Sequence, residues 1–242
     1  MRYSVKGNQV SYGEAIGIMV IENYAPYVPG DTANASSYDF PVRFERLPGS
    51  TPARLFAHDE TLVDVAIEVG HKLVGEGVRA VTGDCGFLAL HQNRIAEELE
   101  VPVFISSLLQ LDFIDRITGP AGKTGVITAN SASLDRQLLR EVTSVPDERL
   151  RIEGLEEKPE FVTAVFDEKG TLDTDLVEAE VLEVAQTLTE DEAVRAILLE
   201  CSLLPPYAAA VQEATGLPVF DYNTMIRYVY SAVVRRRFDG FM

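Results

Sequence analysis

Two cysteines are the residues of this 242-residue chain whose chemical type and spacing indicate a reaction. An acidic residue precedes each of them, in the pairs Asp84-Cys85 and Glu200-Cys201. Two cysteines are too few for a disulfide framework, and no histidine lies within a few residues of either, so a thiolate zinc site is not indicated. We therefore expect free thiols, which can exchange protons near neutral pH because an unperturbed cysteine has a pKa of about 8.5.

The segments around the two cysteines are related to each other. When the sequence is shifted by 116 residues, segment 78–104 aligns with segment 194–220 without a gap, and nine of the 27 aligned residues are identical. Similar patterning in two α/β units explains matches between apolar residues, but it does not explain a rare residue at the same strand end. We infer a duplication that gives each half one cysteine.

Short apolar, β-branched runs alternate with longer stretches of helical period, which is typical of βα units around a parallel sheet. We predict strands at residues 15–22, 78–84, 101–106, 124–129, 150–153, 194–200 and 217–220. We predict helices at residues 59–75, 88–100, 107–117, 131–143, 175–188, 205–215 and 223–236. A Gly/Pro-rich segment at 119–122 separates the two series.

The predicted fold is α/β, with two Rossmann-like halves whose mostly parallel sheets are related by a pseudo-twofold axis. Residues 1–120 form the N-terminal half with Cys85, and residues 121–242 form the C-terminal half with Cys201. The last helix is free to cross back onto the first half, and we expect Asp221 to cap its start.

Each cysteine follows a predicted strand and precedes a predicted helix, and ligands bind at this carboxyl edge of open α/β sheets. A helix N-terminus favours the thiolate over the thiol. Strand alternation is expected to send Asp84 and Glu200 to the opposite face. Across a cleft between the halves, one thiolate could take a proton from a carbon next to a carboxylate while the opposite thiol returns one. Such chemistry needs no metal or organic cofactor, but it needs polar donors for the carboxylate and the developing charge.

The composition and net charge argue against several classes of binding partner. Hydrophobic residues make up 46% of the chain, as in globular proteins, and the formal net charge of -17 argues against nucleic acid and anionic membrane surfaces. No apolar stretch approaches the roughly 20 residues of a membrane span. The polar start, Met1 to Val10, lacks the apolar stretch of a secretion signal, so we expect a cytoplasmic protein with a small carboxylate as its ligand. The oligomeric state, including a homo-oligomer, stays open.

Five segments make the chain resemble the aspartate/glutamate racemase superfamily, whose members are cofactor-independent enzymes with two α/β halves and a cysteine from each half in the cleft between them. The resemblance covers nearly the whole chain. It rests on the strand Ile16–Glu22, the loop Pro29–Asn34 and the stretches Gly83–Phe87, Gly125–Asn130 and Glu200–Ser202.

The resemblance implies that Cys85 and Cys201 are the catalytic pair. It places substrate-binding residues just after the two cysteines and at three further positions, namely Asn34, Gly86, Phe87, Asn130, Ser131 and Ser202. His91 and its counterpart in the repeat, Tyr207, are candidates for an auxiliary polar role.

Departures from the amino-acid racemases of this superfamily leave the reaction open. Those enzymes usually carry Cys-Asn-Thr and Cys-Thr at the two sites, whereas this chain has Cys85-Gly86-Phe87 and Cys201-Ser202-Leu203, which favours a less polar pocket. A racemase or epimerase is our first expectation. The alternative is another enzyme of the superfamily, such as a lyase like the algal enzymes that cleave dimethylsulfoniopropionate, a maleate isomerase or an arylmalonate decarboxylase. A non-catalytic ligand-binding or thiol redox-responsive protein is the alternative from another class.

Overall fold

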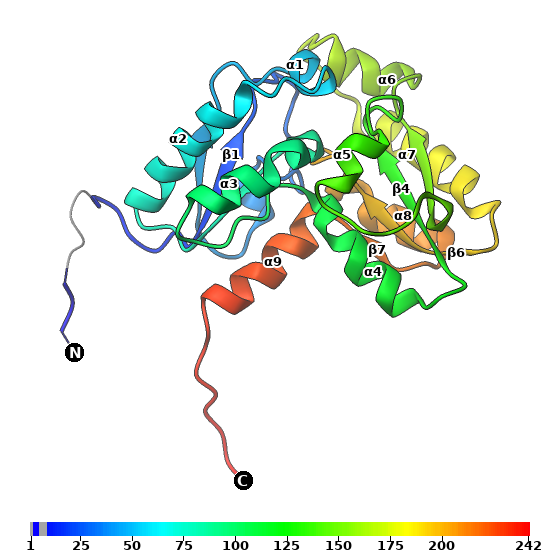
Figure 1. Ribbon diagram of the computed structural model, residues 1–242. Helices are drawn as coiled ribbons and strands as arrows, with labels where there is room; N and C mark the ends of the chain where they lie inside the picture. The colour runs from blue at the N-terminus through cyan, green and yellow to red at the C-terminus, as the bar shows by residue number, and fades with distance from the viewer. Residues whose placement is uncertain (1, 5–8) are drawn as a thin grey trace.

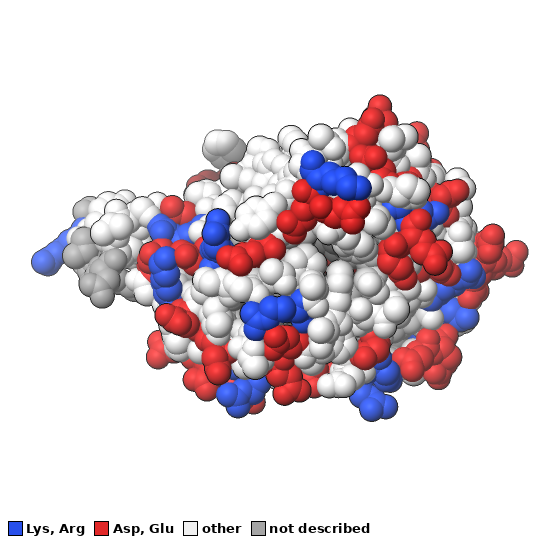
Figure 2. Space-filling model, turned by 90° about the horizontal axis from the view of Figure 1, so that it is seen from above, with Lys and Arg blue, Asp and Glu red and all other residues white. Residues whose placement is uncertain are grey.

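Two parallel sheets, each covered by helices, form the framework of the computed structural model (Figure 1). The structure describes residues 2–4 and 9–242; Met1 and residues 5–8, which belong to the polar start of the chain, lie outside the described residues. Within those described ranges, no helix has both the length and the apolar character that crossing a bilayer requires. Seen from above, acidic side chains spread over the surface with basic ones between them (Figure 2).

The first sheet has the strand order β2-β1-β3, and all its pairs are parallel. Its strands are β1 (Ile16–Val20), β2 (Val42–Arg46) and β3 (Ala80–Gly83). Helices α2 (Leu62–Gly75) and α3 (Gln92–Glu98) accompany this sheet. Helix α2 buries an apolar stripe that includes Leu62, Ala66 and Leu73, as its helical period predicts.

The second sheet has the order β5-β4-β6-β7 and is also parallel throughout. Its strands are β4 (Lys123–Thr128), β5 (Leu150–Gly154), β6 (Val194–Leu199) and β7 (Val219–Phe220). The helices packed against it are α4 (Leu111–Thr118), α7 (Thr174–Thr189) and α8 (Ala208–Thr215), whereas α5 (Arg136–Arg140) contacts the 3-10 helix Gly86–His91 of the first half. The predicted α/β class with two parallel sheets is confirmed.

The final helix, α9 (Tyr222–Val233), returns to the first sheet (Figure 1). It begins at the expected cap: the Asp221 carboxylate accepts the Thr224 backbone N–H, and the Thr224 hydroxyl pairs with the Asp221 backbone. Its buried residues Tyr222, Met225 and Ile226 join an apolar cluster with side chains of β1 and β3. Helix α4, although it lies before residue 120, packs against β4 and β6.

Several predicted elements differ from the observed ones. Strand β2 was not predicted because three of its five residues, VRFER, are charged, and at the sheet edge its residues are partly buried or, for Arg46, exposed. The predicted strand 101–106 makes a single bridge, between Val81 and Val103. The predicted helix 131–143 shortens to α5, and helix 88–100 begins as a 3-10 helix, Gly86–His91.

Among the short helical segments that were not predicted from the sequence, three lie next to the pocket described for the two cysteines. They are α1 (Pro52–Phe56), α6 (Pro159–Phe161) and the π-helix Val162–Phe166 that continues α6. A single helical turn holds too few residues for a recognisable period. Helix α1 and the π-helix both contribute side chains to the wall of the pocket described next.

Candidate active site

Cys85 and Cys201 lie at corresponding strand ends and line one pocket between the two halves. Each follows its strand by two residues, after Gly83 of β3 and Leu199 of β6. Both are free thiols; Cys201 is buried and Cys85 is partly buried. The structure therefore brings the two predicted cysteines together at the carboxyl ends of parallel strands, where ligands bind in such folds.

The pocket is small: the space in it that water-sized molecules can occupy is about 30 Å³. Its wall combines polar, apolar and aromatic side chains, and no lysine, arginine or histidine is among the described residues that line it. The lining residues other than the cysteines are Ile21, Asn23, Tyr27, Pro52, Phe56, Asp84, Gly86, Phe87, Ala129, Val165, Phe166, Glu200, Ser202 and Leu203.

The two acids that precede the cysteines line the same pocket, so the prediction that they face away is wrong. Strand geometry ends at the residue before each acid, and alternation no longer applies there. Asp84 Oδ1 instead accepts the backbone N–H of Ile21 at 2.9 Å. Glu200 Oε2 accepts the Thr128 hydroxyl at 2.8 Å. The other oxygen of each carboxyl, Oδ2 and Oε1, is buried without a hydrogen-bond partner.

Burial raises the pKa of Asp84 to about 7 and that of Glu200 to about 7, because the charged form loses its hydration. The hydrogen bonds to the anchored oxygens act in the opposite direction but do not cancel this effect. Near neutral pH, each of these carboxyls can therefore give up or take a proton.

The same surroundings raise the pKa of both thiols well above the ordinary range. For Cys85 the largest cause is burial, followed by the charges of Glu200 and Asp84. For Cys201 burial is again first and Glu200 second. Backbone N–H groups at the start of the following segments, such as that of Leu203, lower the pKa but are outweighed. The backbone N–H groups thus act in the expected direction, but burial and the neighbouring acids outweigh them and favour the neutral thiols.

Aromatic rings form one wall of the pocket. Phe87, a predicted site residue, packs edge-on against Phe56 with ring centroids 4.8 Å apart. Phe56 also meets Phe166 edge-on at 5.6 Å. These rings come from the segment after Cys85, from α1 and from the π-helix, so the wall joins both halves. The expected lower polarity of this pocket agrees with that wall.

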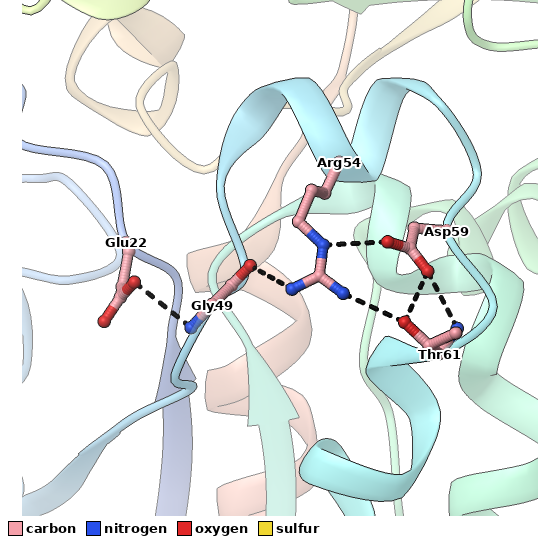
Figure 3. A network of polar contacts seen from close by, with 5 residues as sticks. All are labelled: Glu22, Gly49, Arg54, Asp59 and Thr61. Atoms are coloured by element: carbon pink, nitrogen blue, oxygen red, sulfur yellow. Dashed lines mark hydrogen bonds and ion pairs between the residues drawn. The ribbon is translucent and has the colours of Figure 1, made fainter.

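A polar network fixes α1, which carries Pro52 and Phe56 to the pocket (Figure 3). The Arg54 guanidinium donates to the Asp59 carboxylate at 2.8 Å, to the Gly49 carbonyl at 2.8 Å and to the Thr61 hydroxyl at 2.9 Å. The Glu22 carboxylate, just beyond β1, accepts the Gly49 N–H at 3.1 Å. The network thereby ties the aromatic wall to the end of the central strand.

Gly86 lines the pocket as predicted, and its lack of a side chain has a steric reason. A Cβ atom at Gly86 would lie 1.7 Å from Glu200 Oε1, far inside contact distance. Glu200 belongs to the other half of the protein, so its carboxyl reaches across the cleft to the residue after Cys85. Ser202, the counterpart of Gly86 in the repeat, also lines the pocket, and its carbonyl accepts the Thr32 N–H at 3.2 Å.

Three predicted binding residues do not line the pocket. The Asn34 side chain caps the 3-10 helix Ala35–Ser37 and donates to the carbonyl of Tyr27, which does line it. Asn130 Oδ1 accepts the Ser133 N–H, and the Ser131 hydroxyl pairs with Glu156. These local bonds occupy the polar groups that the family pattern would direct at a ligand.

Sequence reasoning missed several pocket residues. Asn23 follows β1, and the rule that ligands gather at the carboxyl ends of parallel strands could have found it. Phe56 and Phe166 come from segments without a sequence signal. His91 and Tyr207, the auxiliary candidates, are buried but do not line the pocket. In the described ranges, no group of three or more His, Cys, Asp or Glu side chains is arranged to hold a metal ion.

Comparison with curated proteins finds relatives over most of the chain. Dimethylsulfoniopropionate lyase 3 of Emiliania huxleyi (strain CCMP1516) is 32% identical over 222 residues, which are 87% of this chain and 57% of that protein. Dimethylsulfoniopropionate lyase of Durusdinium sp. clade D is 30% identical over 217 residues, covering 86% of this chain and 71% of that protein. The chain thus spans little more than half the length of the Emiliania relative. No protein-family model matches the sequence.

Comparison with solved structures finds the same fold in more distant proteins. A glutamate racemase from Bacillus anthracis superimposes with a TM-score of 0.59 at 14% identity, covering 90% of this chain and 82% of that one. Unliganded arylmalonate decarboxylase gives 0.56 at 18% identity, with 91% and 92% covered. An aspartate racemase homologue from Pyrococcus horikoshii OT3 gives 0.56 at 15% identity, with 91% and 99% covered. The predicted resemblance to this superfamily is confirmed at the level of the fold.

Proposed function

Because this chain belongs to the family of these dimethylsulfoniopropionate lyases, within the aspartate/glutamate racemase superfamily, we propose that it is a lyase that eliminates a β leaving group from a small carboxylate such as dimethylsulfoniopropionate. One observation carries the proposal: two thiols from equivalent strand ends line a single small pocket whose wall is aromatic and acidic.

The reaction needs one base at the carbon next to the carboxylate. A cysteine thiolate removes the α-proton, so that the C–H bond breaks and an S–H bond forms. The electron pair of the C–H bond forms the C=C bond of acrylate, and the bond from the β-carbon to sulfur breaks. Dimethyl sulfide leaves with the electron pair of the broken carbon–sulfur bond, and one proton is released to water in each turnover.

The residues that line the pocket suit a substrate whose end opposite the carboxylate carries a cationic sulfonium group. Aromatic faces attract onium cations, and Phe56, Phe87 and Phe166 supply rings on one side. Asp84 and Glu200 add negative charge when ionised, and no cationic side chain among the described lining residues opposes it. In this proposal the Ser202 hydroxyl and backbone N–H groups beside the cysteines hold the substrate carboxylate.

Substrate access requires part of the wall to move, because the free space in the pocket holds only about one or two waters. The α1 segment and the π-helix supply the aromatic side of that wall. One hydrogen bond, from the Asn23 amide to the Val165 carbonyl at 2.8 Å, ties the π-helix to the end of β1. Opening the pocket therefore means releasing this bond or shifting α1.

The names of the relatives favour elimination over racemisation and so reverse the order expected from the sequence. The products separate the two reactions, since elimination yields an alkene acid and racemisation changes only configuration. Purified protein should be incubated with dimethylsulfoniopropionate, aspartate, glutamate and a hydantoin in heavy water. We expect dimethyl sulfide and acrylate from the first compound. Deuterium exchange at the α-carbon of an amino acid or hydantoin, without dimethyl sulfide release, would instead support a racemase.

A further inference from the structure

The geometry points to Glu200 as the proton acceptor of Cys85: its carboxylate takes the thiol proton and leaves Cys85 as the base. The role in elimination rests on the proposed function, whereas the Glu200–Cys85 pair can be tested without a substrate. Glu200 acts through Cys85, so it is a positioning residue that sets the protonation state of the reacting sulfur.

The Glu200 carboxyl is held at one oxygen and free at the other. Oε2 accepts the Thr128 hydroxyl at 2.8 Å, and the backbone N–H of Ala129 also donates to the carboxyl. Oε1 is buried and has no hydrogen-bond partner. Because Glu200 has no exposed surface, bulk water does not reach this oxygen either. A buried polar atom without a partner is costly and uncommon, so a functional role is the reason we assign to it.

The free oxygen lies against Gly86, the residue that follows Cys85, rather than within its own half. Oε1 occupies the space that a Gly86 side chain would fill, and the Glu200 carboxyl carbon lies 2.4 Å from that same Cβ position. Gly86 directly follows Cys85 in the chain. Among charged groups, Glu200 also has the largest effect on the Cys85 thiol, ahead of Asp84.

The proton transfer balances without any further reactant. The S–H bond of Cys85 breaks, its electron pair stays on sulfur, and an O–H bond forms at Glu200 Oε1. The net charge of the pair stays at one negative charge, which moves from oxygen to sulfur. A cationic substrate in the pocket stabilises that charge at the sulfur, so binding promotes formation of the thiolate. After elimination, Cys85 is again a thiol and Glu200 returns its proton to water.

Other titratable groups face Glu200 and must be considered. Asp84 and Cys85 approach it from the end of β3, Cys201 is its neighbour in the chain, and Tyr222 faces it from α9. Burial keeps the pKa of Tyr222 well above its ordinary value, so this phenol stays protonated. Asp84 is the remaining competitor, and it provides a matched variant.

The first test measures the thiol itself. In a Cys201→Ser background, the alkylation rate of Cys85 by iodoacetamide is followed by mass spectrometry from pH 7 to about 11, because the midpoint lies well above the ordinary pKa of a thiol. Removing the neighbouring carboxylate in Glu200→Gln should lower the Cys85 pKa, so the midpoint of alkylation shifts to lower pH by about one pH unit or more. Glu190→Gln, at an exposed glutamate, should leave it unchanged.

The second test measures the rate of dimethyl sulfide release in protein that retains both Cys85 and Cys201. Glu200→Gln should release dimethyl sulfide about 100-fold more slowly, although its Cys85 is more readily ionised. Glu200→Asp, which keeps a carboxylate, should retain the alkylation profile of the parent more closely than Glu200→Gln. Thermal unfolding checks that the variants are folded.

Two outcomes overturn the inference: an alkylation midpoint that does not move in Glu200→Gln, or a Glu200→Gln enzyme that turns over as fast as the wild type or faster. If the wild type releases no dimethyl sulfide, the proposed reaction fails. The alkylation profiles still decide in that case whether Glu200 and Cys85 form a proton-exchanging pair.

Discussion

The two cysteine regions have the same backbone plan but different side chains. Asp84-Cys85-Gly86 follows β3, and Glu200-Cys201-Ser202 follows β6 at positions shifted by 116 residues. Both acids accept a backbone N–H from the end of the neighbouring central strand, from Ile21 after β1 and from Ala129 after β4. The second acid is longer by one methylene group, and the residue after the first cysteine lacks a side chain.

This difference makes a symmetric framework chemically asymmetric. The longer Glu200 reaches across the cleft and occupies the space left by Gly86. The other half pairs the shorter Asp84 with Ser202, which carries a side chain. A racemase must handle protons equivalently on two faces of a carbon, whereas an elimination needs a base on one. The asymmetry therefore agrees with the proposed lyase.

The largest expected effect separates the two cysteines. Cys85→Ala removes the proposed base and should lower the rate of dimethyl sulfide release by about 1000-fold. Cys201→Ala should have a smaller effect, because Glu200 and Cys85 remain in place. Initial rates measured by headspace gas chromatography check this. Equal losses of rate in the two variants would show that the two cysteines are functionally equivalent, contrary to the structural difference between their surroundings.

The two acids should also make folding depend on pH. Their ordinary pKa values are 3.8 and 4.5, and burial raises each to about 7, so the folded state holds these protons more tightly than the unfolded state. Stability is then lost as pH rises through about 7. Each of Asp84→Asn and Glu200→Gln should relieve up to about 3 kcal/mol of that loss.

Urea unfolding at pH 5 and pH 9 measures this contribution. The difference in unfolding free energy between each variant and the wild type should favour the variant more at pH 9 than at pH 5. Glu190→Gln serves as the control because its carboxylate is largely exposed. If the wild type and both variants changed stability equally between the two pH values, the buried carboxyls would already be ionised in the folded protein.

Placing a serine after Cys85, as the chain has after Cys201, tests whether the missing side chain at Gly86 makes the two halves differ. In Gly86→Ser the new Cβ collides with Glu200 Oε1, and displacing that carboxyl should slow turnover by about 100-fold. The double variant Gly86→Ser/Glu200→Asp copies the arrangement of the other half and should recover stability without full activity. Kinetics and thermal unfolding of both variants check this. Wild-type activity in Gly86→Ser would show that the position of Glu200 is unimportant.

The smallest effect concerns the aromatic wall. Arg54→Ala removes the hydrogen bonds that hold α1 and should lower stability by about 1 kcal/mol, because the guanidinium is partly exposed. A loosened α1 should also speed iodoacetamide labelling of Cys85. Arg46→Ala, at a more exposed arginine near the same Glu22 carboxylate, is the matched control. Unchanged labelling in Arg54→Ala would show that α1 does not limit access.

The sequence predicted the parallel sheets and the meeting of the cysteines because the duplication repeats both the strands and their ends. It could not predict which way Asp84 and Glu200 point, since this depends on strands that end one residue earlier than expected. Asn34, Asn130 and Ser131 matched a family pattern, but local hydrogen bonds hold them outside the pocket wall. Phe56 and Phe166 belong to single helical turns, whose place in the site depends on tertiary packing alone.

The most direct test of the asymmetric site is the pH dependence of kcat/KM for dimethyl sulfide release in the wild type, Glu200→Gln and Asp84→Asn. The account predicts a rising limb near pH 7 in the wild type, because Glu200 must be ionised to accept the Cys85 proton. That limb should persist in Asp84→Asn, whereas in Glu200→Gln it should move from about pH 7 to the higher pH at which Cys85 itself ionises. The same limb in all three proteins, or its loss only in Asp84→Asn, would contradict the account.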